Sequence, residues 1–108
     1  MNSFHAQVHA LVALLPQGKV VSYGKIAAAL GRPRASREVG RAMHHCPDHL
    51  PWQRVVMADG TITGGSYATQ RKALLQDEGI TFTPSGKVNV KAHAIDPFEL
   101  ELMALSLN

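Results

Sequence analysis

A basic stripe near the middle of the chain carries the residues best suited to chemistry. Arg34, Arg37, Arg41 and His44 recur at three- and four-residue spacing, so on a helix they share one face. Arginines on one face can neutralise phosphates and release counterions, which supplies most of the non-specific affinity for nucleic acids. The alternative is an ordinary solvated helix face. The spacing therefore predicts an exposed basic surface. The fold around the stripe decides whether this surface binds nucleic acid or is an ordinary solvated face.

Positive charge is concentrated around this stripe. Residues 19–54 hold seven Lys and Arg against two acidic residues, a balance of +5. The whole chain of 108 residues has a net charge of +3 and a pI near 9.4, so the other residues together carry −2. A one-sided basic block of this kind is typical of a nucleic-acid site.

The single cysteine, Cys46, limits the other chemistry that the chain can carry. One thiol forms no internal disulfide and cannot by itself make a structural zinc site, and we predict no metal and no cofactor. Neither a signal pattern nor an apolar run of the ~18 to 20 residues that a membrane span needs is present. We expect a monomer in the reducing cytoplasm, without membrane contact.

A helix-turn-helix must position the stripe. Apolar spacing predicts a core-facing helix over residues 3–15 and a second over 23–30, with Ser22 as N-cap. A third is predicted over 35–46. Gly31 ends the second helix in the short turn before the third, and a helix, a turn with Gly and a helix form the helix-turn-helix pattern. The stripe on its second helix favours DNA binding over a plain solvated face.

Short strands and two more helices complete the predicted fold. Two β-hairpins are expected, one pairing 54–57 with 61–63 and one pairing 80–82 with 88–90, and helices are expected over 68–78 and 98–107. With 45% hydrophobic and 18% charged residues the chain can bury a modest core. The sequence predicts one domain over residues 1–108, mainly α with small β hairpins, a winged helix-turn-helix DNA-binding domain.

Three motifs carry a resemblance to a known family. They are Val-Ser-Tyr-Gly-Lys-Ile-Ala at 21–27, Ser-Arg-Glu-Val-Gly-Arg-Ala-Met at 36–43 and Leu-Pro-Trp-Gln-Arg-Val-Val at 50–56. In this order, within residues 4–82, they resemble the C-terminal DNA-binding domain of the O6-alkylguanine-DNA alkyltransferases. In those enzymes the third motif is Pro-Cys-His-Arg-Val. Its cysteine thiolate takes the alkyl group from guanine, and its histidine helps to activate the thiolate.

The third motif departs from the family at both reactive positions. Trp52 stands at the cysteine and Gln53 at the histidine. Indole offers only an N–H donor, and an amide cannot accept a proton as imidazole does. The sequence therefore resembles the alkyltransferase-like proteins, a subgroup with this tryptophan that binds alkylated DNA without repairing it. The resemblance implies a non-enzymatic protein that flips O6-alkylguanine out of duplex DNA and flags it for nucleotide excision repair proteins.

The resemblance also assigns DNA contacts residue by residue. Arg37 matches the arginine that enters the base stack, and Tyr23 matches the tyrosine that rotates the nucleotide by crowding its 3′ phosphate. Gly40 and Ala42 would let the helix approach the minor groove closely. From the basic stripe itself, and not from a family match, we expect Arg34 and Arg41 to contact phosphates. The plainer alternatives are that Tyr23 is a half-buried aromatic and that Arg37 contacts only phosphate.

The remaining motif positions divide between the pocket and its support. Trp52 and Gln53 would line the pocket for the flipped base, although a lone tryptophan is also a common core residue. Arg54 would tie the loop to the fold. Glu78 matches the family's acidic residue behind the active site, where we expect a structural role. The family's Tyr-Ser-Gly-Gly loop is shortened here to residues 63–65, so its lesion contacts are not carried over.

Two other functions compete with this interpretation. An active alkyltransferase would need Cys46 as nucleophile, but that residue falls on the packing stripe of Val39 and Met43. It has Pro47 after it, where many alkyltransferases have Asn-Pro. A winged-helix transcription regulator would need Asn or Gln to read bases in the major groove, and residues 35–45 contain neither.

Overall fold

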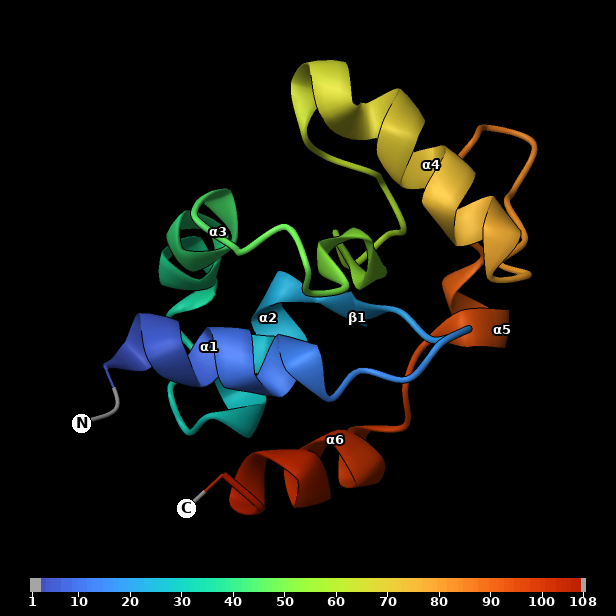
Figure 1. Ribbon diagram of the computed structural model, residues 1–108. Coiled ribbons are helices and arrows are strands. Elements are labelled where there is room, and N and C mark those ends of the chain that lie inside the picture. The colour runs from blue at the N-terminus through green and yellow to red at the C-terminus, as the bar shows by residue number, and fades with distance from the viewer. Residues whose placement is uncertain (1–2, 108) are drawn as a thin grey trace.

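Helices make up most of the fold, which a computed structural model describes for residues 3–107 (Figure 1). The α-helices of this part are α1 (Phe4–Ala13), α2 (Tyr23–Ala29), α3 (Ser36–His44), α4 (Ala68–Asp77), α5 (Val90–His93) and α6 (Pro97–Leu105). The two strands are β1 (Val21–Ser22) and β2 (Val55–Val56), and short 3-10 turns cover Trp52–Arg54 and Gly65–Tyr67. None of these helices is long and apolar enough to cross a membrane.

The predicted helix-turn-helix is confirmed, and local signals explain its boundaries. Ser22 caps α2, because its hydroxyl accepts the backbone N–H of Lys25 over 3.1 Å. Gly31 follows α2 with φ +81°, a left-handed conformation that favours glycine at a helix end. α3 ends at His44, two residues earlier than predicted, so that Cys46 and Pro47 lie in the following loop.

Two apolar clusters hold the helices together. The larger one joins α1, α2, α3 and α6, with Leu11, Ile26, Val39 and Leu100 among its buried side chains. The smaller one lies under α4 and contains Val20, Val56, Leu75, Ile80 and Val88. Figure 1 shows α6 and α4 on opposite sides of the molecule, with β1 between them. The pair of β-strands thus links the helix-turn-helix to α4 and the smaller apolar cluster.

The hairpin predicted over 54–57 and 61–63 is wrong as a strand pair. β2 pairs with β1 instead, in parallel, with Val21 opposite Val55 and Ser22 opposite Val56. Val55 and Val56 are both buried, which a parallel, two-sided environment satisfies and a hairpin with one solvated face does not. Residues 57–61 form only a local turn, where the Asp59 carboxylate accepts the N–H of Thr61 over 2.9 Å.

The second hairpin is confirmed in a reduced form. Phe82 and Val88 form one antiparallel bridge, and the N–H of Thr83 donates to the carbonyl of Lys87 over 2.7 Å. The predicted strand over 88–90 does not reach Val90, because this residue begins α5. The hairpin also touches the turn at Gly60, where φ is +91° and a Cβ would lie 2.3 Å from the carbonyl oxygen of Val88. Only glycine fits that approach.

Candidate nucleic-acid interface

One face of α3 is basic and open to solvent. Arg37, Arg41 and His44 are exposed, and Arg34 is exposed in the turn that precedes the helix. Val39 on the other face is fully buried. The division of α3 into a packing side and a basic side follows its sequence spacing, because residues three and four apart share a helical face. The structure therefore brings the predicted phosphate-binding residues onto one surface.

The two small residues of α3 have different surroundings. A Cβ added to Gly40 would meet no protein atom within 4 Å among the described residues, so the space beside this glycine is open. Ala42 is fully buried against α1, so the expectation that it lets the helix approach a groove closely was wrong. Its position follows from helical geometry, because Ala42 lies three residues after Val39 on the packing side. Close approach to a groove would thus depend on Gly40.

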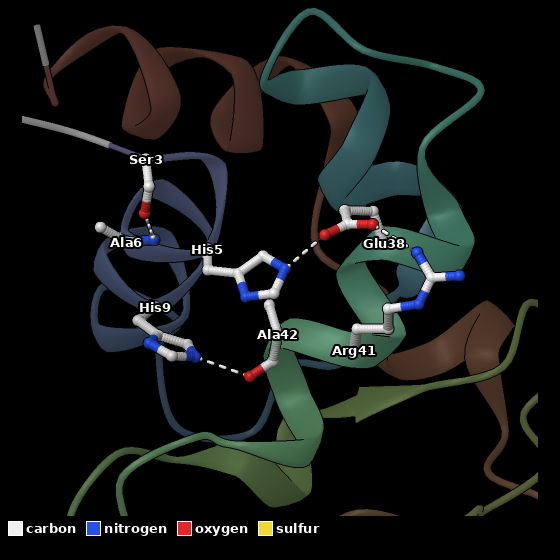
Figure 2. A network of polar contacts seen from close by, with 7 residues as sticks. All are labelled: Ser3, His5, Ala6, His9, Glu38, Arg41 and Ala42. Atoms are coloured by element: carbon white, nitrogen blue, oxygen red, sulfur yellow. Dashed lines mark hydrogen bonds and ion pairs between the residues drawn. The ribbon is translucent and has the colours of Figure 1, made fainter.

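Polar contacts fix α3 against α1 (Figure 2). The Nε2 atom of His5 lies 2.5 Å from Oε2 of Glu38, and Arg41 donates to Oε1 of Glu38 over 2.5 Å. The Nε2 atom of His9 lies 2.7 Å from the carbonyl oxygen of Ala42. The hydrogen bonds from His5 and Arg41 lower the pKa of Glu38. Glu38 therefore stays ionised and holds Arg41 at the edge of the basic face.

A second group of contacts joins the start of α2 to the third motif. The Tyr23 hydroxyl lies 2.8 Å from Oγ1 of Thr63, and the same Oγ1 accepts a hydrogen bond from Nη1 of Arg71 over 3.2 Å. The guanidinium carbon of Arg71 lies 5.1 Å from the centre of the Trp52 ring, within the range of a cation–π contact. Tyr23 and Trp52, which the sequence assigned to one site, are thus linked through Thr63 and Arg71.

Arg71 is the site residue that the sequence analysis missed. Its side chain extends from α4 to Trp52 and is only 8% exposed. One signal was available, because Arg71 lies four residues before Leu75 and so shares the buried face of the predicted helix. An arginine on a packing face requires a special environment, and this one finds it beside Trp52.

Gln53, which follows Trp52 in the third motif, has a supporting role. The amide nitrogen of Gln53 donates to Oε2 of Glu78 over 2.7 Å, and Nε of Arg54 donates to both carboxylate oxygens over 2.9 and 3.0 Å. The backbone N–H of Gly18 donates to Oε1 over 2.9 Å. Arg54 also donates to the carbonyl of Leu15 over 2.6 Å. Gln53 follows Trp52 directly, but its amide nitrogen is turned toward this carboxylate.

The ionisation of Glu78 follows from these contacts. Burial by itself raises the pKa of a carboxyl group, since it penalises the charged form. Here the hydrogen bonds from Gly18, Arg54 and Gln53 outweigh that effect, and the pKa of Glu78 is lowered. An ionised Glu78 that faces the Arg54 guanidinium joins α4 to the loop of the third motif. This geometry is that of a structural ion pair.

Cys46 lies in the loop after α3. Burial raises the pKa of its thiol and the negative charge of Asp48 raises it further, which outweighs the opposing effect of the Arg71 charge. A thiol that stays protonated is a poor nucleophile. Between residues 3 and 107 no three His, Cys, Asp or Glu side chains are grouped so that they could hold a metal ion.

Comparisons with known proteins show which family the chain resembles. The family model for the DNA-binding domain of 6-O-methylguanine DNA methyltransferase matches residues 3–80. A protein of Escherichia coli K12 named DNA base-flipping protein is 41% identical over 96 residues, which cover 85% of this chain and 74% of that protein. Alkyltransferase-like protein 1 of Schizosaccharomyces pombe is 39% identical over 85 residues, which cover 74% of this chain and 79% of that protein.

A solved structure shows the same fold. It is the S. pombe alkyltransferase-like protein in complex with damaged DNA containing O6-carboxymethylguanine, which superimposes with a TM-score of 0.77 at 33% identity, covering 90% of this chain and all of that one. The predicted fold class, a mainly helical winged helix-turn-helix, is thereby confirmed. The chain belongs to the family of the 6-O-methylguanine DNA methyltransferase DNA-binding domain and, within it, to the alkyltransferase-like proteins.

Proposed function

We propose that this protein binds duplex DNA containing O6-alkylguanine and flips the damaged nucleotide into a pocket beside Trp52. The observation that carries the proposal is the chain of contacts from Tyr23 through Thr63 and Arg71 to Trp52. This chain links the Trp52 ring, at the position that the resemblance gives to the family's nucleophile, through two residues to the tyrosine that the resemblance assigns to nucleotide rotation. The relative named as a base-flipping protein supports the same activity.

The basic face of α3 supplies the DNA contacts in this proposal. Arg34 and Arg41 bind phosphates, while Arg37 enters the base stack in place of the extruded nucleotide. A guanidinium suits that task, because its planar group can stack and donate hydrogen bonds at the same time. Gly40 leaves room for α3 to approach the groove, and Tyr23 crowds the 3′ phosphate. The family resemblance is the support for these roles.

Extrusion favours a damaged base for two physical reasons. An O6-alkyl group weakens the pairing of guanine, which lowers the cost of flipping, normally a few kcal/mol. The alkyl group also gains free energy when it leaves water for an apolar wall such as the Trp52 ring. The side of Gln53 not turned to Glu78 completes the lining of this pocket. The lesion itself thus provides the selectivity.

No alkyl transfer takes place in this proposal. Trp52 supplies no nucleophile, and Gln53 donates its amide to Glu78 and cannot take a proton. The raised pKa of Cys46 argues against that thiol as a substitute. Binding without repair leaves the lesion in place. We therefore propose that residues 1–108 act as one monomeric domain in the cytoplasm and present the lesion to nucleotide excision repair proteins.

A titration tests the binding step. Two duplexes of the same sequence, one with a single O6-methylguanine and one with guanine, are titrated with the protein at the same salt concentration. We expect tighter binding to the damaged duplex and a steep loss of affinity for both with rising salt, as for a site with several Lys and Arg contacts. Equal affinities for the two duplexes would refute the proposal.

A further inference from the structure

Arg71 is a buried cation without an acidic partner in the described part of the chain. Its side chain is 8% exposed, and none of the ion pairs among residues 3–107 includes it. Its Nε atom is buried and has no hydrogen-bond partner among these residues. Burial of an unpaired charge costs free energy, so we expect such a side chain to have a role that compensates for this cost.

Among the described residues, the hydrogen bonds and the aromatic contact of the Arg71 guanidinium all go to elements of the candidate site. Nη1 donates to Oγ1 of Thr63 over 3.2 Å and lies 3.4 Å from the carbonyl oxygen of Val55, at the start of β2. The guanidinium faces the Trp52 ring at 5.1 Å. The same Oγ1 of Thr63 lies 2.8 Å from the Tyr23 hydroxyl. One planar group therefore joins the 3-10 turn, β2 and the 57–64 loop, and reaches α2 through that loop.

The neighbouring residue on α4 has no such contacts. The ammonium of Lys72 lies 5.2 Å from the centre of the Phe82 ring, which packs on the smaller apolar cluster. The two residues thus present the same charge from the same helix to different aromatic rings. Of these two side chains, Arg71 contacts Trp52 and Thr63, whereas within the described part of the chain Lys72 has no hydrogen bond to either.

We propose that Arg71 is a positioning residue that holds Trp52 and the Tyr23 hydroxyl as one unit and thereby sets the preference for the damaged nucleotide. This inference rests on the proposed base-flipping function and adds a residue to it. A guanidinium suits the task, because it can hold its charge over the indole ring and donate a hydrogen bond to Thr63 at the same time. An ammonium can keep the charge but cannot make both contacts in that geometry.

Four variants separate positioning from simple filling of the interior. Arg71→Met keeps the length of the side chain and removes its charge and donors, while Arg71→Lys keeps the charge. Thr63→Val cuts the link to Tyr23 and leaves the contact between Arg71 and Trp52. Lys72→Met is the matched control, since it removes the same charge from the adjacent position. Circular dichroism and thermal unfolding verify that each variant is folded.

The first measurement needs no DNA. Trp52 is the only tryptophan of the chain, so its fluorescence reports this one ring. We expect acrylamide to quench Trp52 more strongly in Arg71→Met and Arg71→Lys than in the wild type, whereas Lys72→Met and Thr63→Val leave the quenching unchanged. Unchanged quenching in both folded Arg71 variants would show that Arg71 does not hold the ring, and would overturn the proposal.

The second measurement compares the O6-methylguanine duplex with its undamaged control. We expect Arg71→Met, Arg71→Lys and Thr63→Val to lower the ratio of the two affinities, about tenfold for Arg71→Met, as for a lost hydrogen bond to a charged group. Lys72→Met keeps the ratio. Ratios within twofold of the wild type in all three site variants would overturn the proposal. If the wild-type protein itself shows no preference, the base-flipping function fails, and the quenching alone decides whether Arg71 fixes Trp52.

Discussion

The amide nitrogen of Gln53 lies 2.7 Å from Oε2 of Glu78 and donates its hydrogen to that carboxylate. Gln53 occupies the position of the histidine that activates the thiolate in the alkyltransferases. A histidine can donate one N–H to such a carboxylate and use its other nitrogen as a base, but an amide has no second nitrogen. In the proposed function, Glu78 therefore supports an amide where the resemblance predicts a general base.

The first prediction concerns alkyl transfer. Incubation with DNA containing O6-methylguanine should leave the mass of the protein unchanged, because neither Trp52 nor Gln53 can react. Trp52→Cys alone should give at best weak transfer, since the new thiol has no activating base. Trp52→Cys with Gln53→His should react faster than the single variant. Intact-protein mass spectrometry measures all three, and a stoichiometric gain on the unchanged protein, at Cys46 or elsewhere, would contradict the account.

The second prediction concerns phosphate contacts. Arg34→Ala or Arg41→Ala should weaken binding to damaged and undamaged duplexes alike. Each should lower the slope of log affinity against log salt by about one unit, because one fewer counterion is released. Fluorescence anisotropy at several salt concentrations measures both slopes. A loss confined to the damaged duplex would show that the residue reads the lesion and not the backbone.

The third prediction concerns the only acidic residue of α3. Glu38→Gln should increase affinity for both duplexes by about two- to fivefold, because it removes a negative charge beside the phosphates and frees Arg41. Glu99→Gln is the matched control, since Glu99 is exposed in the first turn of α6, outside the basic face. Unchanged or weaker binding in Glu38→Gln would mean that its contacts with His5 and Arg41 are needed to hold α3.

The fourth prediction concerns Glu78 and pH. Because its pKa in the folded protein is lowered from 4.5, its contribution to stability is present at neutral pH and is lost as the pH falls below 4.5 through the folded pKa. Glu78→Gln should lower the free energy of unfolding at pH 7 by about 3 kcal/mol, since the Arg54 charge, whose side chain is only 15% exposed, loses its partner. Urea unfolding of both proteins measures this difference, which should shrink in acid. A difference independent of pH would refute an ionised Glu78.

Local signals made the helices predictable from the sequence. Ser22 and Gly31 mark the helix-turn-helix by capping chemistry that acts within a few residues, and the apolar spacing of α3 sets its buried side. The parallel pairing of β1 with β2 joins Val21 to Val55 across more than thirty residues, so no local pattern contains it. The hairpin that the sequence favoured instead was the nearer, local alternative.

Site residues could be predicted from the sequence only where they lie in one of the family motifs. Tyr23 and Trp52 were assigned from the family resemblance, and the structure links them. Arg71 belongs to none of the quoted motifs, and its guanidinium contacts Thr63, Val55 and Trp52, which all lie outside α4. Ala42 was expected to let the helix approach the groove closely, although its spacing from Val39 already indicated the packing face, where it is fully buried. Long-range contacts determine the position of Arg71, whereas that of Ala42 follows from local helical spacing.

Arg37 carries the central claim that the damaged nucleotide leaves the stack. If the side chain fills the vacated space, Arg37→Ala should lose the lesion preference by about 1 to 3 kcal/mol, the scale of base stacking and base contacts. Arg34→Ala, the matched loss of an exposed arginine beside α3, should keep the preference while it weakens both duplexes.

The most direct measurement is the fluorescence of a base analogue placed next to O6-methylguanine in the duplex. The analogue is quenched while it is stacked and brightens when its neighbour is extruded. We expect wild-type protein and Arg34→Ala to raise the fluorescence at saturation and Arg37→Ala to leave it near the level of free DNA. An unchanged signal with saturating wild-type protein, or a full rise with Arg37→Ala and equal weakening of both duplexes, would contradict base flipping by an inserted Arg37.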